Sequence, residues 1–247
     1  MKKTITVLAA CGAVLATTVP AHAAPVKDPV RALKSKLVAG HGVRFAETTV
    51  VTGDGKLTLQ KRKGSFQFDA KGIAASDISA TSKGRADERT ISVGTYSYTK
   101  GGIYKEKFEG GATWVKSRGL PGGASGFYGQ VINPAEPKTL AALVKKGRLK
   151  GRTLTGKITF KDLAKVSRWF DASVPLRMHD DTKVSYTLTL SSAGLVSRVK
   201  SSYAATGVFD ANGFEGKTMT IDSRFTGWGA KTRIKAPAPS DVATAPN

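Results

Sequence analysis

The sequence predicts a mostly β, α+β fold, namely an incomplete antiparallel β-barrel of about ten strands capped by three short helices. Apolar and polar residues alternate over long stretches, which is typical of antiparallel strands with one buried and one wet face. Short connections join these stretches, and helical periodicity is confined to three places. Because so broad an apolar sheet face must be covered, a half-closed barrel with helices over its concave side fits the pattern.

The clearest alternation lies in the second half of the chain. Strands are expected around residues 153–160, 184–190 and 218–225, where threonine, serine and charged residues occupy every second position. The apolar positions between them are expected on the covered side of the sheet, where they form either ordinary core or the wall of a ligand cavity. These positions are Leu154, Ile158, Val184, Tyr186, Leu188, Met219, Ile221 and Phe225.

The first half interrupts its alternation in two places. Residues 61–64, "KRKG", separate one apolar pair at 57 and 59 from another at 66 and 68, which predicts a hairpin turn. At Gly94 the apolar positions change from odd to even residue numbers. A glycine at such a change predicts a β-bulge.

Helical signals occur in three segments. Residues 28–39 open with an Asp-Pro pair, suited to an N-cap and a first helical position, and a glycine follows them. Residues 132–147 have prolines ahead, leucines at helical spacing, two lysines in the last turn and a closing glycine. Residues 161–170, "KDLAKVSRWF", place apolar side chains on one helical face.

The N-terminus has the features of an export signal. Two lysines follow the initiator, residues 4–18 are mostly apolar, and "AHA" at 21–23 is a small-residue cleavage site. We therefore expect residues 1–23 to be a signal peptide and the mature protein to be secreted, either extracellular or in the cell envelope. "LAAC", ending at Cys11, is an alternative lipidation site, but the apolar run before it is only about seven residues, so we expect Cys11 to leave with the signal.

The remaining chain is expected to form one domain over residues 24–236. Its length allows a substantial core, and the chain has no cysteine after Cys11, so it must fold without a disulfide. Residues 237–247 are rich in proline and alanine, which predicts a disordered tail.

The charge balance is strongly basic, with 39 lysines and arginines against 18 acidic residues and a formal net charge of +21. Because this charge is spread along the whole chain, it indicates a folded domain with a cationic surface. For an exported protein the matching partners are an anionic membrane surface or an acidic wall polymer. No nucleic-acid partner is expected, because no recognition motif accompanies the charge.

No grouping of residues indicates catalysis. His41 lies in a glycine-rich turn, and His179 is followed directly by Asp180 and Asp181, where adjacent side chains on a turn do not converge on one metal ion. Phosphate-binding glycine loops, nucleophile elbows and metalloprotease helices are missing from the sequence. We therefore expect no catalytic residues, no metal, no cofactor and no enzymatic activity.

The order of elements resembles that of a known family. The segments "DPVRALKSKL", "ATWVKS", "INPAEPKTLAALVKKG" and the closing "IDSRFTGWGAKTRIKAPAPSDV" are similar to those of the LolA-like lipoprotein-carrier superfamily, specifically its actinobacterial LppX/LprG-type branch. Strand endings similar to F-T-x-W-G-x-x-x-x-I-x-A-P are common in that branch, and the resemblance covers about residues 28 to 242. The weak lipidation site at Cys11 departs from the many relatives that are lipoproteins.

The resemblance implies a half-barrel whose apolar concave side holds acyl chains under its helices. The function it implies is a non-enzymatic carrier or binder of lipid, lipoprotein acyl chains or another amphiphile. Two alternatives stay open at this point. The first is a fully packed barrel that binds acidic wall polymers through its cationic surface, and the second is a lipid-sensing domain that acts on a partner.

Trp228, in "TGWG", lies outside the inward alternation of Ile221 and Phe225. Its two flanking glycines predict a bulge or corner that turns the indole onto the sheet. We therefore expect Trp228 to anchor the last long strand rather than to contact a ligand.

Overall fold

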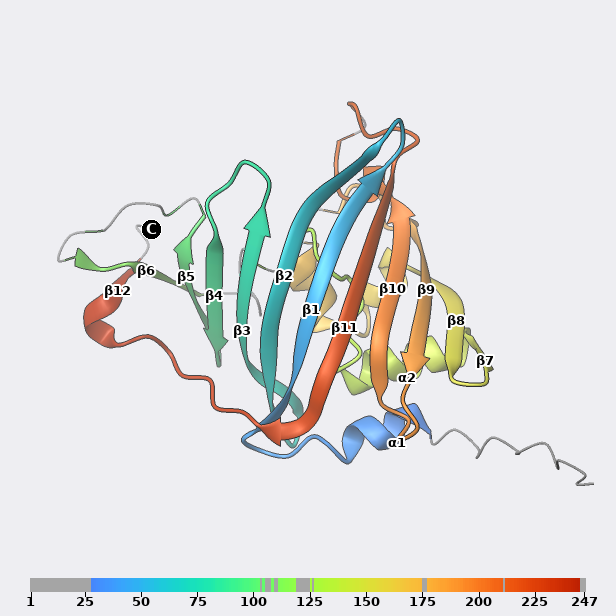
Figure 1. Ribbon diagram of the computed structural model, residues 1–247, viewed down its shortest axis with the longest axis horizontal. Coiled ribbons are helices and arrows are strands. Elements are labelled where there is room, and N and C mark those ends of the chain that lie inside the picture. Colours follow the sequence, from blue (N-terminus) through green and yellow to red (C-terminus); the bar gives the residue numbers. More distant parts are fainter. Residues whose placement is uncertain are drawn as a thin grey trace, which may run out of the picture.

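The computed structural model describes residues 28–102, 104, 108, 111–118, 125, 127–174, 177–210 and 212–244. Within them, one twelve-stranded sheet curls around four short α-helices (Figure 1). The strand order is β12-β6-β5-β4-β3-β2-β1-β11-β10-β9-β8-β7, so β12 and β7 form the two edges of an open barrel. All neighbours are antiparallel except β12 and β6, which are parallel. The predicted fold class is confirmed.

The strands are longest at the centre of the sheet and shortest at its two edges. Their bounds are β1 (His41–Thr52), β2 (Lys56–Asp69), β3 (Gly72–Ser82), β4 (Glu88–Val93), β5 (Tyr96–Gly101), β6 (Trp114–Arg118), β7 (Arg148–Lys150), β8 (Thr153–Thr159), β9 (Lys183–Leu190), β10 (Val196–Ala204), β11 (Thr218–Lys231) and β12 (Val242–Thr244).

The helices are α1 (Pro29–Lys34), α2 (Pro137–Lys146), α3 (Phe160–Ala164) and α4 (Arg168–Ser173). The first two lie within the predicted segments. The third predicted helix is divided in two, because the Ser167 hydroxyl accepts a hydrogen bond from the Phe170 amide and so caps a new helix after α3 has ended.

Two predictions for the first half were wrong, namely the hairpin turn at residues 61–64 and the β-bulge at Gly94. Residues 61–64 continue β2 without a turn, because Arg62 points inward to an ion-pair partner while Lys61 and Lys63 point outward. The hairpin between β1 and β2 lies instead at residues 53–55. Gly94, with φ of 61°, lies in the tight two-residue turn between β4 and β5 rather than in a bulge.

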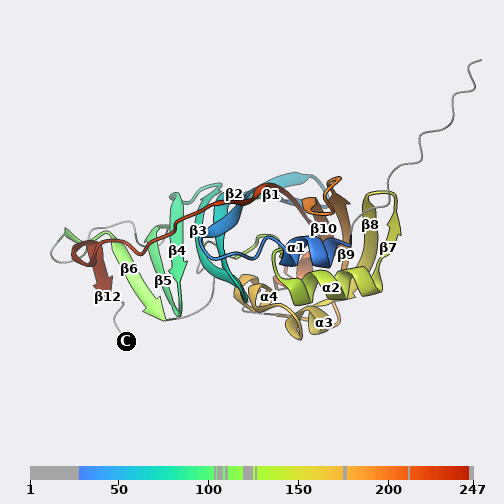
Figure 2. The same cartoon turned by 90° about the horizontal axis from the view of Figure 1, so that it is seen from below.

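The two faces of the sheet have different surroundings. Figure 1 looks onto the convex face, with α2 behind the sheet, and Figure 2 shows the helices gathered on the concave side. In Figure 2, β4, β5, β6 and β12 extend to one side, away from the helices. The apolar core therefore lies between the helices and the concave face of the central and later strands.

The C-terminal segment is more ordered than its composition predicts. Residues 239–241 form a 3-10 turn and Val242–Thr244 pair with β6, so disorder is wrong for this part of the predicted tail. Residues 1–27, which include the predicted signal peptide and Cys11, lie outside the described residues. Among the helices that are described, none has the length and apolar character needed to cross a membrane.

Candidate functional site

The eight positions predicted for the covered side lie together on the concave face. All belong to the main core, and their exposed fractions range from 0% for Val184, Leu188, Met219 and Ile221 to 6% for Phe225. Tyr186 donates a hydrogen bond of 2.7 Å from its hydroxyl to the Leu143 carbonyl oxygen in α2. Burial raises the pKa of the Tyr186 hydroxyl to about 12. The sheet wall is thus in direct contact with the helix layer.

The helix layer covers this wall with large apolar side chains. Leu140 and Leu143 come from α2, Leu163 from α3 and Phe170 from α4, and each is at most 1% exposed. The Phe160 ring packs against Phe170 with ring centroids 5.0 Å apart. Contact of the predicted wall residues with an acyl chain therefore stays a prediction that requires the helices to move.

A single carboxylate joins two of these helices. Glu136, the N-cap residue of α2, accepts hydrogen bonds from the Thr139 hydroxyl at 2.9 Å, the Ser167 hydroxyl at 2.5 Å and the Trp169 amide at 2.9 Å. Burial raises the pKa of Glu136, and the hydrogen bonds from Ser167 and Trp169 oppose that shift. The layer over the wall is therefore held at one end by a single ionisable group.

A buried polar cluster crosses the middle of the concave face. Glu47 forms an ion pair with Arg62 at 2.7 Å, and the two side chains are 2% and 1% exposed. Glu47 also accepts hydrogen bonds from the Ser223 hydroxyl at 2.9 Å and from the backbone amide of Gln130 at 3.0 Å. Arg62 donates to the Ser125 carbonyl oxygen at 2.7 Å. These bonds tie the segment after β6 to the inside of the sheet.

Sequence reasoning missed this cluster because it assigned residues 61–64 to a turn. Arg62 lies between two lysines, and a run of three cations is usually exposed. The available signal was the spacing of Glu47 from the apolar positions at 43, 45 and 51, which gives it the same parity and so the same face.

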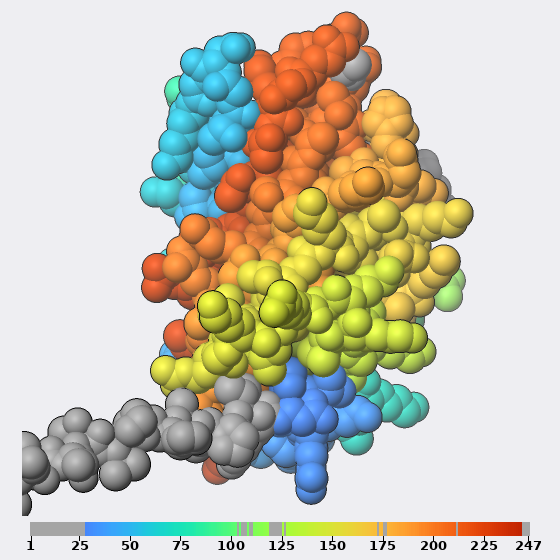
Figure 3. All heavy atoms as spheres, turned by 90° about the vertical axis from the view of Figure 1, so that its right-hand side faces the viewer, coloured from blue at the N-terminus to red at the C-terminus, as the bar shows by residue number. Residues whose placement is uncertain are grey.

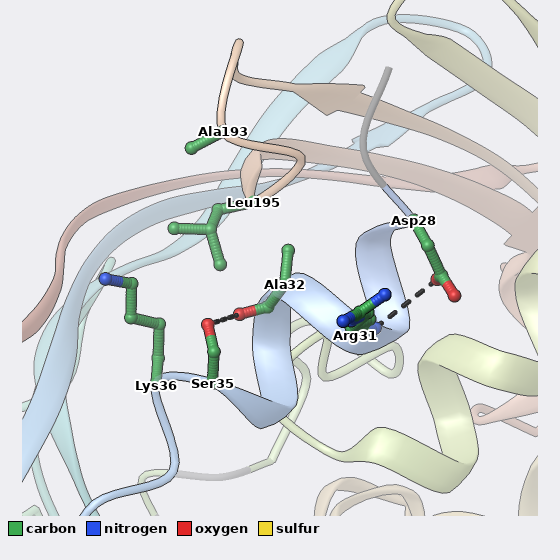
Figure 4. Close-up of a pocket in the computed structure, with 7 residues that line it drawn as sticks. All are labelled: Asp28, Arg31, Ala32, Ser35, Lys36, Ala193 and Leu195. Atoms are coloured by element: carbon green, nitrogen blue, oxygen red, sulfur yellow. Dashed lines mark hydrogen bonds between the residues drawn. The ribbon is translucent and has the colours of Figure 1, made fainter. Parts of the chain in front are cut away.

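A cavity of about 550 Å³ lies outside the core, between α1 and the turn that joins β9 to β10 (Figure 4). Its apolar lining is Ala32, Ala193 and Leu195, its cationic lining is Arg31 and Lys36, and Asp28 and Ser35 complete it. Leu33, on the opposite side of α1, is 1% exposed and belongs to the core. The side view shows α1 beneath α2 at the lower end of the molecule (Figure 3). We call this space the α1 cavity.

Trp228 lies beside the α1 cavity and holds the strands around it. Its indole nitrogen donates a hydrogen bond of 2.8 Å to the Val196 carbonyl oxygen, and its ring stacks on Phe68 and Phe225. Residues 227–229 form the predicted bulge, since Arg44 and Gly42 of β1 pair with Thr226 and Ala230 around them. The predicted anchoring role of Trp228 is therefore confirmed.

The backbone conformation at position 229 explains why a second glycine, Gly229, follows the tryptophan. Its φ is 79°, and a Cβ added there would lie 3.1 Å from Cδ of Lys36. The positive φ favours glycine, and the absence of a side chain leaves room for the stem of Lys36, which lines the α1 cavity.

Neither histidine is among the residues that line the α1 cavity. His41 is at the start of β1 beside the Ala39 carbonyl oxygen, and His179 is exposed in a turn with Asp180 and Asp181. Asp180 is paired with Arg177 at 3.6 Å. In the described ranges, no three histidine, cysteine or acidic side chains gather as metal ligands.

Comparison with known proteins gives similarity in fold only. The chain matches no protein-family model and no curated protein. Among solved structures it is similar to LprF from Mycobacterium bovis, with 14% identity and a TM-score of 0.43, over 86% of this chain and 94% of LprF. It is similar to the Mycobacterium tuberculosis lipoprotein LppX, with 10% identity and a TM-score of 0.40, over 84% of this chain and 96% of LppX.

A third similar structure is a DUF1329 family protein from Desulfovibrio piger, with 10% identity, a TM-score of 0.32, and coverage of 81% of this chain and 94% of that one. At these identities and TM-scores we base no functional argument on the similarity. LppX is one of the two proteins after which the LppX/LprG-type branch is named.

Proposed function

We propose that this protein is an exported, non-enzymatic binder of a lipid or another amphiphile, whose acyl chain lies between the concave sheet and the helix layer. The observation that carries the proposal is the α1 cavity, whose 550 Å³ lie within the usual range for ligand pockets. It combines apolar and cationic side chains at one end of the half-barrel, next to its apolar core. An amphiphile with a negatively charged head has the same two parts.

In this proposal α1 is the movable element. A helix of six residues is unstable by itself, so its position depends on packing against its neighbours. Leu33 provides that packing on the core side, and the Asp28 carboxylate caps the first turn by accepting hydrogen bonds from the Val30 and Arg31 amides. Displacement of α1 would connect the α1 cavity with the eight wall residues.

The energetics of this step come mainly from the acyl chain. Each buried methylene contributes about 0.8 kcal/mol, so a long chain can offset the displacement of one short helix. Arg31, in α1, and Lys36, just after it, would move with the helix and contact the charged head. Because most of the affinity is apolar, we expect affinity to depend on chain length more than on head chemistry.

Displacement of a fluorescent fatty acid tests the proposal. The purified chain should bind the probe, and unlabelled fatty acids should displace it in order of chain length. Ala32→Trp, which fills the α1 cavity from the helix side, should weaken binding by about tenfold, the equivalent of two methylenes. Ala141→Trp is the matched control, since Ala141 is an exposed alanine on α2.

Native mass spectrometry of the protein purified from cells complements this assay. A bound species with the mass of a lipid would support the proposal. A clean mass of the protein alone, together with no probe binding, would contradict it. Equal weakening by Ala32→Trp and Ala141→Trp, at unchanged melting temperature, would contradict the assigned entry site.

A further inference from the structure

The convex face contains a depression of about 510 Å³ in the middle of the sheet. Its floor follows β1, where Ala46 and Thr48 are short side chains facing outward. Lys63 and Lys61 of β2 pair in register with these two residues on one side. Arg224 and Asp222 of β11 pair with them on the other side. We call this depression the β1 trench.

The dimensions of the β1 trench follow from the sheet geometry. β2 and β11 are both neighbours of β1, so their backbones lie about 10 Å apart across the floor. Ser79 and Thr81 of β3 also line the depression, beside Lys63 and Lys61, so it spans the four strands β11, β1, β2 and β3, about 14 Å across, and two outward positions along each strand, about 7 Å. The trench is thus longer across the strands than along them.

The walls are cationic. Lys61, Lys63 and Arg224 are exposed, and within the described residues none of the three belongs to an ion pair. The one carboxylate in the wall, Asp222, accepts hydrogen bonds from Nε and Nη2 of Arg198 on the next strand. Its negative charge is therefore compensated from outside the trench, and the field over the floor stays positive.

We propose that the β1 trench binds a linear acidic polymer, a slender chain that carries phosphate or carboxylate groups at intervals. Charge complementarity selects an anion, and shape selects the polymer. A flat anionic membrane touches only the rim of the depression, whereas a slender chain can enter it and contact Lys61, Lys63 and Arg224 beside Ala46. This site is independent of the acyl-chain site, which lies on the opposite face of the sheet.

Inorganic polyphosphate is a suitable probe, with phosphatidylglycerol vesicles as the membrane comparison. The triple variant Lys61→Gln, Lys63→Gln, Arg224→Gln should weaken polyphosphate binding by about tenfold or more and make its salt dependence shallower by about three counterions. The control Lys138→Gln, Lys145→Gln, Lys161→Gln removes the same charge from exposed positions on the helix side. It should change affinity by less than about threefold.

A second pair of variants tests shape without changing charge. Ala46→Trp fills the floor of the β1 trench and should weaken polyphosphate binding while leaving vesicle binding unchanged. Thr187→Trp places the same side chain on the convex side of β9, away from the trench, and should change neither.

Three outcomes would overturn the proposal. One is equal weakening by the two triple variants, which would show diffuse surface charge to be sufficient. Another is undetectable polyphosphate binding at low salt. The third is vesicle binding that depends on the trench residues while polyphosphate binding does not. All variants replace exposed side chains except Thr187→Trp, whose residue is half-buried, and thermal melting verifies that each is folded.

Discussion

The concave and convex faces of the same strands differ in almost every physical property. On β2, Arg62 points to the concave side and is buried in an ion pair, whereas Lys61 and Lys63 on either side of it are exposed. On β9, Tyr186 and Leu188 belong to the core, whereas Thr187 between them faces outward. The concave face is closed by helices, and the convex face presents an open basic trench.

This difference shows how one sheet can support two kinds of binding. Apolar burial gives the concave face affinity for acyl chains at the cost of moving the helices that cover it. Surface charge gives the convex face affinity for anions without any rearrangement of the protein, and added salt weakens this attraction. Substitutions on the two faces should therefore change the free energy of unfolding by different amounts, affect its pH dependence in opposite directions and weaken the binding of different ligands.

The largest difference is expected for the two ion pairs. Arg62→Met leaves the Glu47 carboxylate buried without its partner and should lower the free energy of unfolding by about 4 kcal/mol. Asp222→Asn breaks the convex ion pair between Asp222, which is 29% exposed, and Arg198, which is 35% exposed. This loss should lower the free energy of unfolding by less than about 1 kcal/mol. Urea denaturation measures both. Equal losses would show that the faces do not differ in this way.

A somewhat smaller difference is expected between neighbours on β9. Leu188→Ala opens space in the core and should cost about 3 kcal/mol. Thr187→Ala, one residue earlier on the convex face, should stay within about 0.5 kcal/mol of the unmodified protein. Thermal and urea unfolding of the two variants check the comparison, and a costly Thr187→Ala would show that something covers the convex side of β9.

The two faces should also respond to pH with opposite sign. Burial raises the pKa of Glu136 above its ordinary value of 4.5, so its stabilising contribution is full below that value and is lost as pH rises through the raised pKa. The hydrogen bond from Arg198 lowers the pKa of Asp222 below 3.8, so its contribution is present above that value and is lost as pH falls.

Unfolding free energies measured between pH 3 and pH 8 separate these effects. Glu136→Gln should remove the decrease on the alkaline side, and Asp222→Asn should remove part of the decrease on the acidic side. If the free energy of unfolding of Glu136→Gln had the same pH profile as that of the unmodified protein, a raised pKa of Glu136 would be contradicted.

A small effect on stability, with none on binding, is expected at Trp228. Trp228→Phe keeps the stacking on Phe68 and Phe225 but removes the hydrogen bond to Val196, at a cost of about 1 kcal/mol. Probe binding should be nearly unchanged, because the residue anchors strands near the α1 cavity without lining it. Loss of fatty-acid binding at unchanged stability would instead assign Trp228 to the ligand site.

Strict alternation made much of the fold predictable from the sequence. Residues 184–190 and 218–225 identify their inward positions directly, because one residue per pair is apolar and the other is polar. The prediction failed at residues 61–64, where the inward residue is Arg62. Its placement depends on Glu47, a partner on the neighbouring strand that local sequence cannot identify.

The candidate sites were less predictable than the fold. The α1 cavity depends on how residues 28–36 meet the turn after β9, two segments far apart in the chain. The β1 trench likewise depends on the register of three strands, which places Lys63 and Arg224 on either side of Ala46. Composition indicated a cationic surface, and only the pairing shows where the cations gather.

Photo-crosslinking with a long-chain fatty acid that carries a diazirine near its methyl end tests the central claim most directly. After irradiation, mass spectrometry of peptides should locate the adducts on the inward positions of β8, β9 and β11, among the eight predicted wall residues. Ala32→Trp should reduce these adducts, and Ala141→Trp should not. Adducts confined to the convex face, or none above those on an unrelated protein, would contradict the claim that acyl chains occupy the concave side.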